Sequence, residues 1–199
     1  MKILTQSFTV VLAWQKGLSA FSSALRDYLS LIIKDSSNEE IVIKDISEDN
    51  EVQINASINN INANITITSY PAVILNFNQY DNDVYKVVDI VKNIISEKFG
   101  KRNEVTEMSY VGIYSIDGNI YEIIKKYVDI KQIFDDMSPF SIRLYKTDSY
   151  LDENLVMEPY ASLRNAVYVY YTTNCKDHDI CIETTRKRIN TLVKFFEGM

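Results

Sequence analysis

The chain has 199 residues, of which 46% are hydrophobic and 24% are charged, and its formal net charge is −6. This length suits one well-filled hydrophobic core, and the composition excludes a disordered chain. The acidic balance disfavours a general nucleic-acid binder, and five glycines in 199 residues exclude the glycine-rich loops that hold phosphates.

The N-terminal segment predicts a strand followed by a helix. Apolar side chains alternate over residues 4–14, and they recur at helical spacing over 18–33. The start of the chain does not read as a signal peptide, because polar residues interrupt its apolar run at positions 5, 6, 7 and 9. No apolar run approaches the ~20 residues that a membrane helix needs. We therefore expect a cytoplasmic protein without a membrane span.

Residues 52–68 carry the clearest pattern in the chain. Apolar residues take alternate positions from 52 to 58 and, after a shift in phase at Asn59-Asn60, from 61 to 67. Because Asn tolerates the positive φ of a type I′ turn, the pattern predicts an antiparallel hairpin. Its polar face carries no charge and contains Gln53, Asn55, Ser57, Asn62, Asn64 and Thr66.

Strands over 41–46 and 72–77 flank this hairpin in the sequence. The next helix is predicted from Asp81 or Asp83, either of which would cap it, to Gly100, because apolar residues recur at helical spacing between Val84 and Phe99. The remaining elements are a strand over 105–116, a helix over 120–133, a strand over 139–145, an acidic loop over 148–153, strands over 155–160 and 167–172, and a helix over 179–197.

The order of these elements predicts the fold class. Consecutive strands with short connections favour antiparallel pairing. We expect a single α+β domain over residues 1–199, with a largely antiparallel or mixed sheet and about four helices packed on it. The sequence shows neither an interdomain linker nor an internal repeat.

Both cysteines and the single histidine lie close together, as Cys175, His178 and Cys181. Zinc takes four ligands, and this Cys-x2-His-x2-Cys spacing supplies three, which leaves the fourth to a carboxylate or water. One alternative is a polar turn in which Asp177 or Asp179 caps the last helix and the cysteines pack as small hydrophobes. A disulfide is the other. Zinc apart, no cofactor is predicted.

A short basic run on the last helix, Arg186 to Arg188, gives a further alternative. Together with stacking tyrosines, Arg186 and Arg188 predict a nucleic-acid contact. The competing interpretation is a helix face that is simply solvated.

Tyrosine is abundant, with 14 in the chain, and Tyr168 and Tyr170 share one face of a predicted strand. Tyrosine-rich surfaces favour protein association, although a core strand covered on both faces would show the same pattern. The hairpin also lacks the charges that normally guard a sheet edge against pairing with another chain. We therefore predict that a hairpin used for assembly and this tyrosine strand contact a protein partner through Gln53, Asn55, Asn62, Asn64, Tyr168 and Tyr170.

Residues 76–80 (Asn-Phe-Asn-Gln-Tyr) lead into a helix and then into the strand Met-Ser-Tyr-Val-Gly-Ile-Tyr-Ser-Ile over 108–116, and the last helix contains Phe196-Glu197. This order resembles a sporadically distributed family of uncharacterised bacterial proteins of similar size, whose central strand reads like Arg-Ile-Gly-Leu-Arg-Tyr. The present chain lacks both arginines and has Tyr110 and Tyr114 nearby. The family has no established activity, so the resemblance implies no catalytic residues.

These patterns predict a non-enzymatic protein-binding module that self-associates into a homo-oligomer. A phage-derived or defence-related partner binder fits a small acidic protein without catalytic motifs. Two other classes stay open: a metal-dependent hydrolase that uses Cys175, His178 and Cys181, and a nucleic-acid binder that uses the basic helix face.

Overall fold

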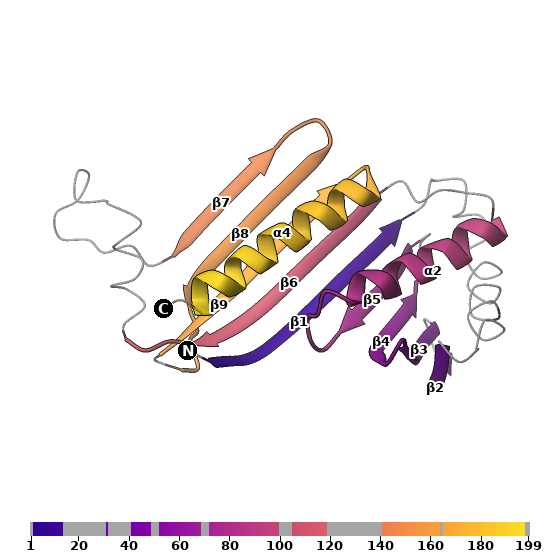
Figure 1. The fold of residues 1–199 in the computed structure, drawn as a ribbon, viewed down its shortest axis with the longest axis horizontal. Helices are drawn as coiled ribbons and strands as arrows, with labels where there is room; N and C mark the ends of the chain where they lie inside the picture. The colour runs from indigo at the N-terminus through magenta and orange to yellow at the C-terminus, as the bar shows by residue number, and fades with distance from the viewer. Residues whose placement is uncertain are drawn as a thin grey trace.

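The computed structural model describes residues 2–13, 31, 41–48, 52–68, 72–99, 105–118, 141–163 and 165–197 (Figure 1). Nine strands form one antiparallel sheet in the order β2-β3-β4-β5-β1-β6-β9-β8-β7. The strands are β1 (Lys2–Ala13), β2 (Ile41–Glu48), β3 (Val52–Ile58), β4 (Ile61–Ile67), β5 (Ala72–Phe77), β6 (Val105–Ser115), β7 (Ile142–Thr147), β8 (Leu151–Pro159) and β9 (Ala166–Cys175).

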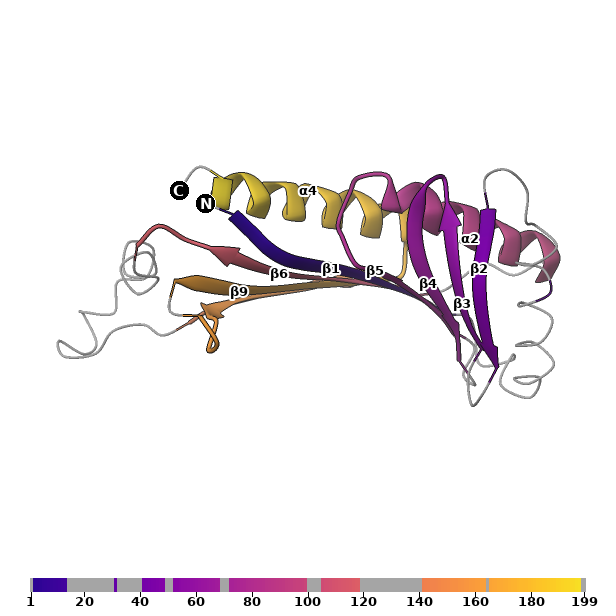
Figure 2. The same cartoon turned by 90° about the horizontal axis from the view of Figure 1, so that it is seen from below.

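Two helices, α2 (Val84–Phe99) and α4 (His178–Glu197), lie on the same face of this sheet (Figure 2). We call that side the helix face and the opposite side the outer face. Neither helix has a stretch that is long and apolar enough to cross a membrane. The helix predicted from Asp81 or Asp83 and the last predicted helix are both confirmed, with starts within a few residues of those expected.

The predicted fold class is wrong. More than half of the described residues lie in strands, and α2 and α4 are the two helices among them, so the described structure is mostly β rather than α+β with about four helices. The antiparallel sheet is confirmed. The helices predicted over 18–33 and 120–133 lie outside the described residues, apart from residue 31. Strands β8 and β9 are longer than expected, and β8 begins at Leu151, within the predicted acidic loop.

The hairpin over residues 52–68 is confirmed in detail. Asn59 and Asn60 have φ angles of 49° and 65°, as a type I′ turn requires. The register pairs Ile54 with Ile65 and Ala56 with Ala63, so the apolar residues share the buried helix face. The hairpin is not a sheet edge, however, because β2 pairs with β3 and β5 pairs with β4. Assembly by strand pairing therefore cannot use the edges of β3 and β4.

The helix face forms the hydrophobic core, and alternation along each strand supplies it. Phe8, Val10 and Leu12 of β1 are fully buried. Leu75 and Phe77 of β5 are at most 1% exposed. The covering helices add apolar stripes of their own, which are Val84, Val87, Val88, Val91 and Ile95 from α2 and Ile189, Leu192 and Phe196 from α4.

Tyrosines fill the centre of this layer. The Tyr114 ring stacks on Phe196 of α4 at 4.4 Å between centroids, and its hydroxyl is hydrogen-bonded to that of Tyr110. Gly112 lies between the two tyrosines in β6. A Cβ at this position would stand 2.6 Å from Tyr114 Cε2 and 2.8 Å from the Tyr110 hydroxyl oxygen. The glycine is therefore needed for this packing.

Two halves of the molecule follow the same path. In the N-terminal half (β1 to α2), the chain leaves the central strand β1, returns through β3, β4 and β5, and closes with α2. In the C-terminal half (β6 to α4), it leaves β6, returns through β7, β8 and β9, and closes with α4. Because β1 and β6 pair antiparallel at the centre, a two-fold axis between them relates the two topologies; β2 has no counterpart among the described strands.

Candidate functional site

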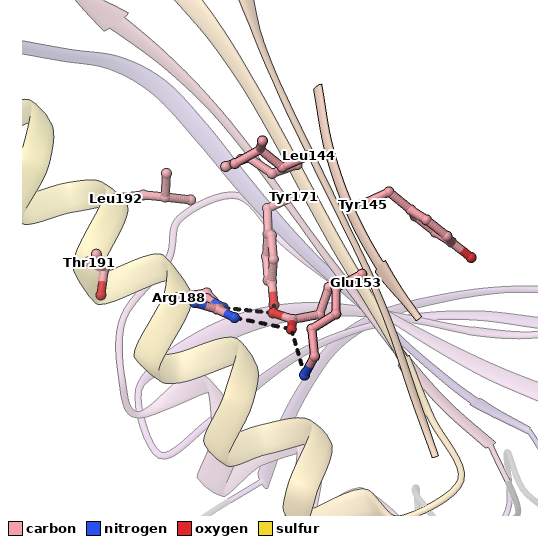
Figure 3. Close-up of a pocket in the computed structure, with 9 residues that line it drawn as sticks. Leu144, Tyr145, Glu153, Tyr171, Arg188, Thr191 and Leu192 are labelled. Atoms are coloured by element: carbon pink, nitrogen blue, oxygen red, sulfur yellow. Dashed lines mark hydrogen bonds and ion pairs between the residues drawn. The ribbon is translucent and has the colours of Figure 1, made fainter. Parts of the chain in front are cut away.

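A groove lies between α4 and the β7–β8 hairpin on the helix face (Figure 3). Its volume is about 240 Å³. Leu144 and Leu155 form an apolar floor from the strands, and Leu192 adds an apolar wall from α4. Leu144 is 57% exposed, so a large apolar side chain of this floor faces solvent.

A buried carboxylate closes the other end of the groove. Glu153 is 5% exposed, and Arg188 of α4 contacts both of its oxygens: Nε donates to Oε1 at 2.7 Å and Nη2 to Oε2 at 3.2 Å (Figure 3). The Tyr171 hydroxyl donates to Oε1 at 2.9 Å, and Lys146 Nζ lies 3.6 Å from Oε2. Period-2 alternation along β8 places Glu153 between Leu151 and Leu155 on the helix face.

These contacts shift the pKa values of the cluster in a consistent way. The hydrogen bonds from Arg188, and then from Tyr171, lower the pKa of Glu153 despite the opposing effect of its burial. The hydrogen bond to Glu153 raises the pKa of Arg188. Burial, and then the neighbouring carboxylate, raises the pKa of Tyr171. Glu153 is thus ionised at neutral pH and saturated with donors, so it anchors α4 to β8 and is unsuited to proton transfer.

Sequence reasoning missed this cluster. It placed Glu153 in a loop and considered Arg188 for nucleic-acid contact, whereas Arg188 is bound to Glu153. Its neighbour Arg186 lies over the Tyr85 ring of α2, 4.8 Å from the centroid. The available signal was the alternation of Leu151, Glu153 and Leu155, which puts a carboxylate on an apolar face.

The residues predicted for zinc lie where β9 meets α4, and all three are buried. The ring nitrogens of His178 have protein partners: Nδ1 lies 3.0 Å from Thr106 Oγ1, and Nε2 lies 3.1 Å from Asp89 Oδ1 of α2. Cys181 Sγ donates to the Thr106 carbonyl oxygen at 3.3 Å. Within the described ranges, no three His, Cys, Asp or Glu side chains are placed to hold a metal ion. The zinc site stays a prediction.

The alternative interpretations of this segment have different outcomes. Both cysteines are free in the structure, which therefore does not contain the disulfide that was one of the alternatives. Asp177 forms the cap that the polar-turn interpretation allowed, because its Oδ1 accepts from the backbone N–H groups of Asp179 at 2.9 Å and Ile180 at 3.1 Å.

The predicted protein-contact residues lie on the outer face in two groups, which β5, β1 and β6 separate. The pairing of β3 with β4 puts Gln53, Asn55, Asn62 and Asn64 on the side opposite the buried hairpin residues. Tyr168 and Tyr170 point away from Tyr171, which contacts Glu153 on the helix face. Neither α2 nor α4 lies on the outer face (Figure 2). Two groups more than 100 residues apart in sequence therefore share one surface.

A ladder of uncharged polar side chains crosses this outer face from strand to strand. Its members are directly paired residues: Asn55, Asn64, Asn76, Thr9, Ser109, Thr172 and Asn154. Asn64 Nδ2 donates to Asn55 Oδ1 at 2.8 Å, and Thr9 Oγ1 donates to Asn76 Oδ1 at 2.9 Å. The ladder links the hairpin surface to the tyrosine strand.

Comparison with known proteins adds no relative. The resemblance drawn from residues 76–80 and 108–116 therefore stays a prediction. No protein-family model matches the chain, and no curated protein matches it at a significant level.

Proposed function

We propose that this protein is a non-enzymatic protein-binding module of the cytoplasm that self-associates through the outer face of its sheet. The observation that carries this proposal is that the two predicted contact groups, the hairpin residues and Tyr168 with Tyr170, lie on one face of the sheet, which no described helix covers. Two free cysteines are in keeping with a reducing compartment.

The chemistry of the outer face supports association. Tyr168 and Tyr170 are half-buried. Val111 and Val156 are the cross-strand neighbours of Tyr170, and Ile113 is a cross-strand neighbour of Tyr168. The polar ladder continues from this apolar centre towards the hairpin. The uncharged ladder borders this centre on one side, and the charged residues Glu158, opposite Tyr168, and Arg143, opposite Val156, border it on the other. In many protein interfaces, central tyrosines carry much of the binding energy.

The outer face is also large enough. Nine strands about 4.8 Å apart, each with about 24 Å of its length on the surface, give a face on the order of 1,000 Å². A standard stable interface buries about 800 Å² on each partner. A second copy of the chain could therefore cover the tyrosines and the neighbouring part of the ladder.

Sedimentation velocity from about 1 to 200 μM tests this proposal. We expect the wild type to form a dimer or higher oligomer and the double variant Tyr168→Asp/Tyr170→Asp to remain a monomer. Tyr150→Asp is the matched control, because Tyr150 is 65% exposed at the β7–β8 turn and should leave the oligomer intact. A monomeric wild type over the whole range, or an unchanged double variant, would contradict self-association through this face.

A further inference from the structure

Strand β7 is a terminal strand of the described sheet. The backbone N–H of Asp148 donates to the Leu151 carbonyl oxygen at 2.9 Å, which makes 148 and 151 a hydrogen-bonded pair. Since such pairs alternate along an antiparallel ladder, the backbone groups of Arg143, Tyr145 and Thr147 point away from β8, towards the edge. A strand arriving there would find its hydrogen-bonding partners already aligned.

The side chains of this edge combine apolar surface with positive charge. Leu144 and Tyr145 are 57% and 69% exposed, on the helix face and the outer face respectively. The two charged residues of β7, Arg143 and Lys146, are both cations. Lys146 lies 3.5 Å from an oxygen of Asp148 and 3.6 Å from one of Glu153. Arg143 is exposed and forms no ion pair with any described residue.

The ion pair between Arg188 and Glu153 lies at one end of the groove beside β7. Arg188 and Glu153 fix α4 against β8, and Leu192 then stands across the groove from Leu144 (Figure 3). A preformed apolar groove lowers the cost of ordering that binding entails. Side chains from a strand added to β7 would alternate between this groove and the outer face.

We infer that β7 and its groove bind an extended, acidic segment of a partner protein, which pairs with β7 as an additional strand. The segment places an acidic residue opposite Arg143 and an apolar residue opposite Leu144, at the mouth of the groove. Arg143 favours this occupant over a second copy of the chain, because β7 contains no carboxylate that a second β7 strand could place opposite Arg143. This site adjoins the outer-face interface proposed above, because Arg143 pairs with Val156 and Val156 pairs with Tyr170.

Fluorescence anisotropy with labelled peptides tests the inference on the full chain. The acidic probe is a hexapeptide, Thr-Glu-Val-Leu-Glu-Val, that in antiparallel register sets Leu opposite Leu144 and Glu opposite Arg143 and Lys146; the matched probe has Lys in place of both Glu. We expect binding in the micromolar range for the acidic peptide and at least tenfold weaker binding for the basic one. No measurable binding of the acidic peptide at 1 mM, or equal binding of the two, would overturn the inference.

Variants locate the binding site. Arg143→Glu and Leu144→Asp should each weaken the acidic peptide by tenfold or more, whereas Lys187→Glu and Leu163→Asp, at exposed positions elsewhere, should leave it unchanged. The variant Tyr168→Ser/Tyr170→Ser, which removes the two aromatic rings without adding a charge near Arg143, should still bind the acidic peptide, which distinguishes this site from self-association.

Hydrogen exchange decides the binding mode. Strand addition should slow amide exchange at Arg143, Tyr145 and Thr147 in the presence of saturating peptide. Peptide binding that leaves these three amides unprotected would refute strand addition.

Discussion

The N-terminal and C-terminal halves of this sheet share a path of strands and a closing helix, yet their helices are attached by different chemistry. The buried stripe of α2 is made of valines and Ile95, together with Tyr85. The buried residues of α4 include His178, Cys181 and Thr185, and Thr185 Oγ1 lies 2.6 Å from Thr173 Oγ1 of β9. Arg188 adds the ion pair to Glu153.

This difference teaches how one topology can be closed in two ways. Apolar packing is not directional, so α2 is stabilised by burial and covers the strands beneath it. Hydrogen bonds and ion pairs are directional, so they fix α4 to β8 and β9 at particular points, and the groove separates α4 from β7. The groove, and with it the candidate site, occurs in the half with the polar attachment.

The largest expected effect tests the apolar half. Ile65 of β4 is fully buried, and Ile65→Ala should lower the free energy of unfolding by about 3–4 kcal/mol through lost burial and the resulting cavity. Ile74→Ala, on the outer face of neighbouring β5, should cost about 1 kcal/mol because Ile74 is already partly exposed. Urea unfolding at pH 7 measures both. Equal losses would mean that the two faces are buried alike.

The next effect tests the polar half and should depend on pH. Glu153→Gln removes the charge that Arg188 binds, and it should cost about 2 kcal/mol at pH 7. Because the pKa of Glu153 is lowered in the folded protein, its stabilisation is present above the unfolded value of about 4.3 and is lost as pH falls through the lower folded value.

Unfolding in urea at pH 7, 4 and 3 should therefore show that the difference in free energy of unfolding between wild type and Glu153→Gln becomes smaller as the pH falls. For Ile65→Ala, the difference in free energy of unfolding from wild type should be the same at all three pH values. A Glu153→Gln gap that does not change with pH would show that the carboxylate charge does not stabilise the attachment of α4.

The smallest effect compares the starts of the two helices. Asp177 accepts two backbone N–H groups at the start of α4, whereas Asp81 accepts that of Asp83 at 2.8 Å, just before α2. Asp177→Ala should cost about 1 kcal/mol and Asp81→Ala about half as much. Thermal unfolding of the two variants in parallel measures the difference. A larger loss for Asp81→Ala would reverse the assignment of the stronger cap.

Prediction from sequence succeeded where one segment contains its own signal. Asn59-Asn60 and the alternation around it specify turn, register and buried face together, and the stripe from Val84 to Ile95 specifies a helix. Prediction failed at Glu153, because the local sequence around a charged residue near a turn does not distinguish a solvated side chain from a paired one. The partner that decides between these, Arg188, lies 35 residues further along the chain.

The sequence by itself determined the local elements, which are the hairpin with its uncharged polar face and the apolar faces of the helices. Periodicity and turn chemistry act over a few residues, so one segment is enough to specify them. The tertiary structure alone decided strand order, and through it the repeated topology, the joining of Asn64 to the tyrosine strand on one face, and the groove beside β7. Local patterns place a residue on a face of its own strand. Which strands are neighbours depends on contacts between residues far apart in the chain, such as His178 with Asp89.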